Sequence, residues 1–282
     1  MTTPTVSATT GDSNCLSQSL LFTEAEWPAV VREVSAQMSG LVEKYTTPIS
    51  KVISDEEGQH CGSGSYCELL GRHLLLSSEH VARERLTHSL APKFFGDDHY
   101  FVLRNHFIAL GAPNDVALAR VDDDEWNRFP HAASAISAGQ FAQSHTSTEG
   151  ELLFIAGYSG ELSRFSFGVL VTPGTPYLAR ECPLPNDSRC NSAFHFALNY
   201  NPGKATSIDG SSRGLPLPPG FSGTLVWNTR VVEMKARVEP GTPDAARVTG
   251  IVWGWPSDTS LLATKVEHMQ LEELALRAIA VK

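Results

Sequence analysis

Apolar residues follow a helical spacing near the start of the chain. They recur mostly every three or four residues, at Trp27, Val30, Val31, Val34, Met38 and Leu41. This spacing predicts one apolar face of a helix, and Thr23-Glu24-Ala25-Glu26 before it matches a capping box. Pro28 is compatible because it falls in the first turn. We expect a helical extension over residues 23–46, preceded by a Thr/Ser-rich mobile tail at 1–22.

From about Thr47 the pattern changes to short apolar runs separated by turn residues. Such runs predict strands of closed or sandwiched antiparallel sheets. The runs are 49–53, 66–70, 73–76, 100–103, 106–110, 116–121, 152–156, 166–171, 193–200, 224–227, 230–238 and 247–253. The segment around 126–140 is a natural break, so we expect one β unit over 47–125 and a second over 141–264. Apolar spacing in the last stretch predicts a helix over 265–282.

Composition narrows the class of protein. The chain has 282 residues and a formal net charge of −9, with no cluster of Lys and Arg, which argues against a nucleic-acid-binding surface. No apolar run is long enough for a membrane helix, and no secretory signal is visible. Five scattered cysteines then favour reduced thiols in a cytoplasm. Local bridges between Cys61 and Cys67, or between Cys182 and Cys190, remain open alternatives.

Candidate chemistry begins at Ser222, in the run Gly220-Phe221-Ser222-Gly223 before an apolar strand. The flanking glycines permit a tight turn that could direct the N–H groups of Gly220 and Ser222 at one point. Two convergent amides there would stabilise the oxyanion of a tetrahedral intermediate. The alternative is an ordinary Gly-Ser turn before a strand.

Two further residues complete a set that acyl transfer by serine requires. His80 follows the apolar run Leu74–Ser77, and Asp115 precedes Val116-Ala117-Leu118. A carboxylate entering a buried strand needs a partner, and an imidazole N–H is a natural one. The alternatives are a surface histidine and a common Asn-Asp turn.

These stretches, with Gly62-Ser63-Gly64-Ser65-Tyr66, resemble in order the motifs of trypsin-like serine peptidases of the chymotrypsin fold. The likeness is closest to bacterial intracellular members and spans about residues 48–265. It implies a mostly β fold of two six-stranded barrels, here with a helix at each end. It also implies His80 as general base, Asp115 as its orienting carboxylate and Ser222 as nucleophile. No metal or organic cofactor is implied.

The chain departs from that family at several positions. Phe221 stands where the family has the aspartate that pairs with a freed amino terminus in secreted zymogens, so activation by that route is not expected. Thr224 replaces a glycine, Val81 replaces a cysteine that would pair with Cys61, and Ser77-Ser78-Glu79 replaces a more typical Thr-Ala-Ala. None of these changes removes a catalytic group.

The resemblance also places the pocket for the side chain before the cut bond. One wall would contain Pro216 and Leu217, and the other Val252, Trp253 and Gly254. The segment from Pro216 to Phe221 holds no acid. We therefore expect a neutral side chain, apolar or small, unless Asp209 or Asp258 reaches the pocket from a loop. His195 is a further pocket candidate, although a packed strand histidine is the simpler interpretation.

The function predicted from the sequence is a serine endopeptidase that cleaves protein or peptide substrates, with a regulatory protein partner as an open possibility. The alternative is a catalytically silent pseudoprotease that binds peptides or proteins in the same cleft. A serine esterase of another fold is disfavoured because its elbow needs glycine at position 224. No nucleic-acid or membrane partner is expected.

Overall fold

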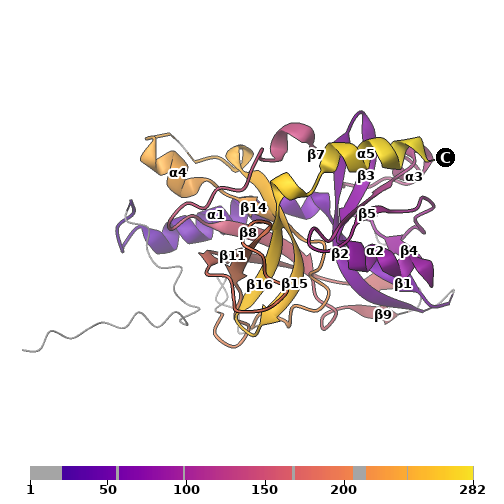
Figure 1. The fold of residues 1–282 in the computed structure, drawn as a ribbon, viewed down its shortest axis with the longest axis horizontal. Coiled ribbons are helices and arrows are strands. Elements are labelled where there is room, and N and C mark those ends of the chain that lie inside the picture. Colours follow the sequence, from indigo (N-terminus) through magenta and orange to yellow (C-terminus); the bar gives the residue numbers. More distant parts are fainter. Residues whose placement is uncertain are drawn as a thin grey trace, which may run out of the picture.

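The structure is a computed structural model that describes residues 21–54, 57–97, 99–166, 169–205, 214–239 and 241–281. Most of the chain in these ranges is β structure, arranged in two large sheets with helices at both ends (Figure 1). The tail predicted for residues 1–22 lies outside the described residues, apart from its last two.

The first sheet has the strand order β4-β1-β2-β3-β6-β5, with β7 beside β2. All of its pairings are antiparallel except that of β7 with β2. The strands are β1 (Thr46–Val52), β2 (Gly58–Leu69), β3 (Arg72–Ser77), β4 (Ser89–Pro92), β5 (Ile108–Leu110), β6 (Val116–Arg120) and β7 (Ile136–Ser137). The two residues of β7 fall in the segment predicted as a linker.

The second sheet is antiparallel throughout, in the order β11-β8-β14-β15-β16-β13-β12. Its strands are β8 (Leu153–Tyr158), β11 (Gly174–Ala179), β12 (Glu181–Cys182), β13 (His195–Asn199), β14 (Leu225–Asn228), β15 (Arg247–Ser257) and β16 (Ser260–Lys265). A small separate sheet pairs β9 (Arg164–Ser166) with β10 (Val169–Val171).

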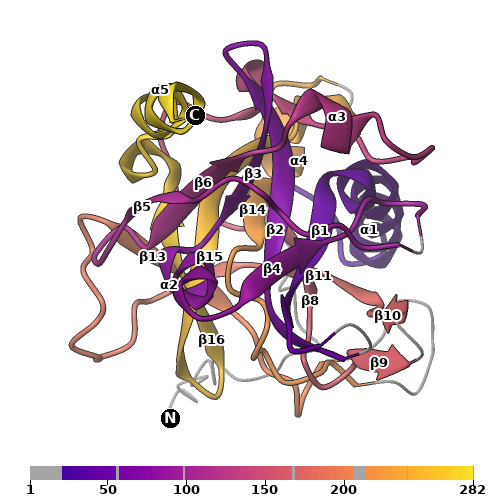
Figure 2. The ribbon, with the colours of Figure 1, turned by 90° about the vertical axis from the view of Figure 1, so that its right-hand side faces the viewer.

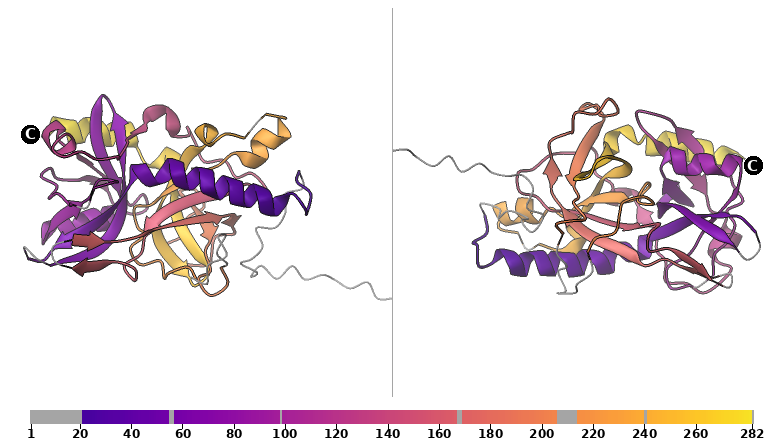
Figure 3. Two further views of the ribbon diagram at one scale, coloured as in Figure 1. Left: turned by 180° about the vertical axis from the view of Figure 1, so that it is seen from behind. Right: turned by 90° about the horizontal axis from the view of Figure 1, so that it is seen from below.

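Helices cover the sheets from outside. They are α1 (Trp27–Val42), α2 (Glu79–Arg83), α3 (Asp123–Trp126), α4 (Val231–Ala236) and α5 (Leu271–Ala280), with short 3₁₀ turns at Glu43–Tyr45, Glu84–Leu86, Ala138–Gln140, Pro243–Ala245 and Val266–His268. Helix α1 lies against β8 and β11 of the second sheet (Figure 3), while α5 packs on β5 and β6 of the first sheet (Figure 2). The Thr23 and Glu26 side chains each bond the other residue's backbone N–H, which is the predicted capping box.

Three apolar clusters explain why two sheets form one body. One cluster lies within the first sheet, around Tyr66 and Leu75, and a second lies within the second sheet, around Phe196 and Val226. The third joins both sheets to α1 and α5 and contains Met38, Trp227 and Leu274 among others. Burial of this shared cluster fixes the sheets relative to each other, and therefore fixes any site between them.

The predicted fold class is confirmed: the chain is mostly β, with two antiparallel sheets, an N-terminal helix and a C-terminal helix. The arrangement is consistent with the double β-barrel of the chymotrypsin type. In the described residues each large sheet has seven strands rather than six. The additional strands are two-residue ones, such as β7 and β12.

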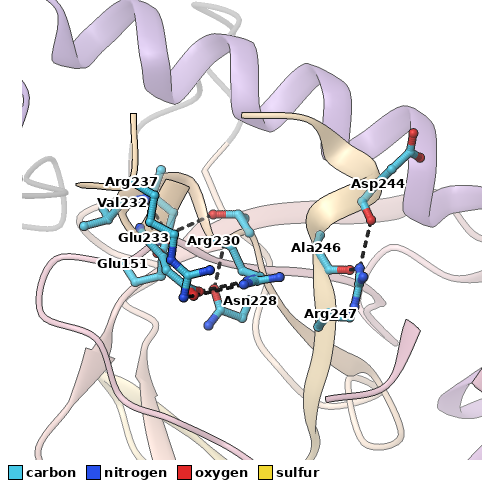
Figure 4. Close-up of polar contacts among 11 residues, drawn as sticks. Glu151, Asn228, Arg230, Val232, Glu233, Arg237, Asp244, Ala246 and Arg247 are labelled. Atoms are coloured by element: carbon cyan, nitrogen blue, oxygen red, sulfur yellow. Dashed lines mark hydrogen bonds and ion pairs between the residues drawn. The ribbon is translucent and has the colours of Figure 1, made fainter. Parts of the chain in front are cut away.

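Two element predictions were wrong. The run 100–103 forms no strand, only an isolated bridge between Tyr100 and Lys93. The run 230–238 was expected to be a strand, but its centre forms helix α4. The reason is a buried carboxylate from elsewhere in the chain. Glu151 accepts the N–H groups of Val232 and Glu233 at 3.1–3.2 Å and caps the first turn (Figure 4). Arg230 turns the chain with a φ of 58° and pairs with Glu233.

The four described cysteines, Cys61, Cys67, Cys182 and Cys190, are free thiols. Neither of the two local bridges left open by the sequence is therefore formed. In the described part of the chain, no helix combines the length and apolar character needed to cross a bilayer.

Candidate active site

His80 and Asp115 are in direct contact. The His80 Nδ1 atom lies 2.7 Å from Asp115 Oδ2, and the His80 backbone N–H donates to Asp115 Oδ1 at 3.0 Å. A carboxylate only accepts hydrogen bonds, so Nδ1 carries the proton and Nε2 remains as the basic nitrogen. The Asp115 side chain is 10% exposed and that of His80 is 40% exposed, which leaves the ring accessible from one side.

Local structure explains how these two residues meet. Strand β3 ends at Ser77, and His80 is the second residue of the short helix α2 that follows. Asp115 immediately precedes β6, the strand that pairs with β3, and has a φ of 48°. The pairing of β3 with β6 thus brings a residue after one strand next to a residue before the other.

Ser222 lies in a tight turn before β14 of the second sheet. The turn contains Gly220 and Gly223, with φ values of 102° and 92°, in the region that favours glycine. Gly223 also lies in a space without room for a side chain, because a Cβ there would stand 2.0 Å from the Ser63 carbonyl oxygen. Backbone conformation and close packing therefore both require the glycines that flank the serine.

The backbone amides of this turn divide into two groups. Those of Phe221, Gly223 and Thr224 donate to carbonyl oxygens at 2.7–2.9 Å. Those of Gly220 and Ser222 donate to no acceptor among the residues that the structure describes. Two unused N–H groups, one residue apart, are what a binding site for an oxyanion needs.

Ser63 ties this turn to the first sheet. Its backbone N–H donates to the Ser222 carbonyl at 2.8 Å, and its hydroxyl donates to the Gly220 carbonyl at 2.7 Å. Its own carbonyl accepts the Ser77 hydroxyl at 2.7 Å, at the end of the strand that leads to His80. The Ser222 turn and the His80 helix are thus both anchored at Ser63.

The Ser222 hydroxyl contacts the Trp253 carbonyl oxygen at 3.5 Å. No hydrogen bond joins it to His80 in the described residues. In enzymes without substrate, catalytic hydrogen bonds are often long or misaligned and tighten only in the complex. The present geometry thus brings His80 and Asp115 together and positions Ser222 beside the same strand end.

A half-buried histidine, His60, packs against the Ser222 turn. The His60 Nε2 atom lies 3.0 Å from the Tyr158 carbonyl, and a Cβ on Gly220 would come within 2.7 Å of the same nitrogen. Burial lowers the pKa of His60, although its contacts with the Tyr158 and Gly220 carbonyls oppose this shift. The lowered pKa favours the neutral ring in this close-packed position.

The predicted pocket residues have different exposures. Pro216 is buried and its carbonyl accepts the Tyr200 hydroxyl at 2.7 Å, whereas Leu217 is 50% exposed and points away from the core. Val252 is buried, and Trp253 and Gly254 are half-buried on β15. Asp258 is exposed in the turn after β15, and Asp209 lies outside the described residues.

Sequence reasoning missed three residues that shape this site: Ser63, His60 and Tyr158. Ser63 was part of the Gly-Ser-Gly motif, which could have indicated close packing at that point but not its partner. His60 and Tyr158 carried no local signal, because their importance comes from contacts with distant residues: Tyr158 is 98 positions from His60 and 95 from Ser63.

No protein-family model matches the sequence, and no curated protein matches it. Comparison of folds finds solved structures with low similarity. One is an inactive serine-to-alanine variant of Rv3671c from M. tuberculosis H37Rv, with 13% identity, 88% of this chain and 94% of that chain covered, and a TM-score of 0.46. Another comes from work on the VPg protein of Sesbania mosaic virus, with 12% identity, 77% and 85% covered, and a TM-score of 0.44.

Proposed function

We propose that this chain is a serine endopeptidase that hydrolyses peptide bonds in protein or peptide substrates. The observation that carries the proposal is the His80–Asp115 pair, joined by two hydrogen bonds and lying beside the Ser222 turn. In that turn the N–H groups of Gly220 and Ser222 have no acceptor among the described residues. Buried carboxylate, basic imidazole, hydroxyl and paired amides are together the groups that serine acyl transfer uses.

In the proposed reaction, Ser222 Oγ attacks the carbonyl carbon of the peptide bond while His80 Nε2 takes its proton. Asp115 stabilises the imidazolium that results and holds the ring in place. The N–H groups of Gly220 and Ser222 bind the oxyanion of the tetrahedral intermediate. His80 then gives the proton to the departing amine, which leaves an acyl-enzyme on Ser222. Water next attacks the acyl carbon while His80 takes its proton. His80 returns that proton to Ser222 Oγ as the ester bond breaks and the acid is released.

The second candidate is a catalytically silent module that binds peptides in the same cleft. The contact of Ser222 Oγ with the Trp253 carbonyl, rather than with His80, is the observation that favours it. The two functions differ in the reactivity of one hydroxyl. A fluorophosphonate probe should label the endopeptidase at Ser222 and leave the silent module unmodified.

The test combines this probe with a substrate assay. We expect intact-mass measurement to show one adduct on the wild type and none on Ser222→Ala. A quenched-fluorescent peptide library should be cleaved by the wild type and not by the variant. Absence of both labelling and cleavage in a folded wild type would favour the binding module.

The free thiols of the described cysteines accord with a reducing compartment such as the cytoplasm, which we propose as the location.

A further inference from the structure

The loop that carries Asp115 belongs to the first sheet but is bonded to the second. His195 Nε2 donates to the Pro113 carbonyl at 2.7 Å, and Thr264 Oγ1 donates to the Asn114 carbonyl at 2.7 Å. The Asn114 side-chain amide in turn donates to the His268 carbonyl at 2.6 Å. Three hydrogen bonds within two residues of Asp115 therefore fix its loop against β13, β16 and the turn after β16.

His195 is the most constrained of these partners. Its side chain is buried, with the residue 2% exposed, and its ring centre lies 5.1 Å from that of Trp253. Nδ1 accepts the Asn191 backbone N–H at 3.1 Å, so the proton must be on Nε2, which faces Pro113. Both ring nitrogens are used, and only the neutral ring can make both bonds.

The groups around His195 favour that neutral ring. Burial is the largest influence and lowers the pKa of His195, and the nearby charges of His268 and Lys265 lower it further. The Pro113 carbonyl and the Asp115 carboxylate act in the opposite direction. While the ring is neutral, Nε2 can donate to the Pro113 carbonyl and Nδ1 can accept from the Asn191 N–H.

We propose that His195 is a positioning residue for the reaction: through Pro113 it holds Asp115, and with it His80, in register with Ser222 across the two sheets. This inference rests on the proposed function, because it assigns His195 a role in the same triad. Asp115 and His80 come from the first sheet, while Ser222 and Trp253 come from the second. A displacement of about 1 Å between such groups can cost on the order of 100-fold in rate.

The test compares His195→Leu with His195→Gln. Leucine removes the donor to Pro113, whereas the glutamine side-chain amide can still reach its carbonyl. We expect His195→Leu to lower kcat roughly 10- to 100-fold with little change in KM, and His195→Gln to restore most of it. His145→Leu is the matched control, since the His145 side chain is also buried, at 4% exposed, but it lies in the segment before β8 and contacts Thr249, Phe196 and Glu181 instead. It should keep wild-type kcat despite a similar loss of stability.

A second readout does not depend on turnover. The His80 Nδ1 proton bonded to Asp115 should give a downfield proton resonance in the wild type, in His195→Gln and in His145→Leu. In His195→Leu this resonance should broaden or disappear. If the wild type hydrolyses no peptide, the proposed function fails but the resonance still reports the positioning. Wild-type kcat and an unchanged resonance in a folded His195→Leu would overturn the inference. Thr264→Val, which removes the neighbouring donor at almost constant volume, provides the same comparison if His195→Leu does not fold.

Discussion

Asp115 accepts two hydrogen bonds from His80, one from the ring at 2.7 Å and one from the backbone N–H at 3.0 Å. The ring bond sets which nitrogen carries the proton, and the backbone bond fixes the start of α2 relative to β6. One carboxylate therefore determines both the tautomer of His80 and the position of its main chain.

Replacing Asp115 by asparagine tests this relationship. The amide would keep the size of the side chain but could not stabilise an imidazolium, and it would favour the wrong tautomer of His80. We expect kcat for peptide hydrolysis to fall by about 10⁴-fold while the fold is retained. Asp123→Asn, at an exposed ion pair with Arg72, is the control and should retain full activity. Equal activity of Asp115→Asn and wild type would contradict the role of Asp115.

The ordered motifs and their resemblance to serine peptidases predicted that His80 and Asp115 lie together, although no local pattern gives the geometry of their contact. Each residue sits at the end of a strong apolar run, and neighbouring strands of an antiparallel sheet bring such ends together. The fold class followed from the same short runs. These signals are local preferences for strands, and the tertiary packing agrees with them.

What the sequence did not predict depends on contacts between distant residues. Residues 230–238 contain enough β-branched and apolar residues to suggest a strand, yet Glu151 caps them as a helix. The bonds of Ser63 to Gly220 and of His195 to Pro113 likewise join segments that are far apart in the chain. Single-sequence patterns hold no information about such partners, which tertiary packing supplies.

Gly220→Ala should distort the turn that carries Ser222. The φ of 102° is unfavourable for alanine, and the new Cβ would lie 2.6 Å from the Tyr158 carbonyl. We expect the Gly220 amide to move and kcat to fall by about 10²–10³-fold, as for the loss of one oxyanion donor. Gly160→Ala is the control, because the nearest atom to its Cβ would be 3.6 Å away. A Gly220→Ala enzyme with unchanged kcat would exclude this amide from catalysis.

Acid should destabilise the protein through His60 and His195. Burial lowers the pKa of both His60 and His195 below that of an unfolded histidine, about 6.5. The unfolded chain therefore binds protons first, so the free energy of unfolding should fall as the pH decreases through about 6.5 and be highest above it. Urea unfolding from pH 8 to pH 5 measures this.

Substitution of His60 separates this effect from general acid sensitivity. His60→Gln should flatten the fall between pH 7 and 5, since glutamine does not titrate. His99→Gln, whose side chain is 80% exposed in the wild type, should leave the slope as it is. Identical pH profiles for wild type and His60→Gln would show that His60 does not contribute.

Reductant should leave the melting temperature unchanged. The four described cysteines are free, and burial raises the pKa of Cys61 and Cys67 to about 12 and that of Cys182 to about 11. Because the thiolate is the reactive form, these thiols should also react slowly with a disulfide reagent in the native state. A native bridge typically contributes about 2–4 kcal/mol, so a clear drop in melting temperature on reduction would reveal one.

The pocket for the side chain before the cut bond should accept only small neutral residues. Two residues of its expected walls, Pro216 and Val252, are buried, and apolar side chains pack beside them. Phe221, Val252, Leu261 and Tyr200 belong to one buried cluster, and the Tyr200 hydroxyl is bonded to the Pro216 carbonyl. None of these side chains offers a carboxylate, and a buried substrate cation without one would pay a large desolvation cost.

A peptide-library profile measures this preference. We expect cleavage after Gly, Ala or Ser, and a shift towards larger apolar residues in Leu261→Ala, which removes volume from the cluster. Leu276→Ala, at a residue 57% exposed on α5, is the control and should keep the wild-type profile. Strong selection for Arg or Lys would contradict this expectation. It would point instead to an acid brought in from a loop, and substitution of Asp258 and of Asp209 in turn would show which one supplies it.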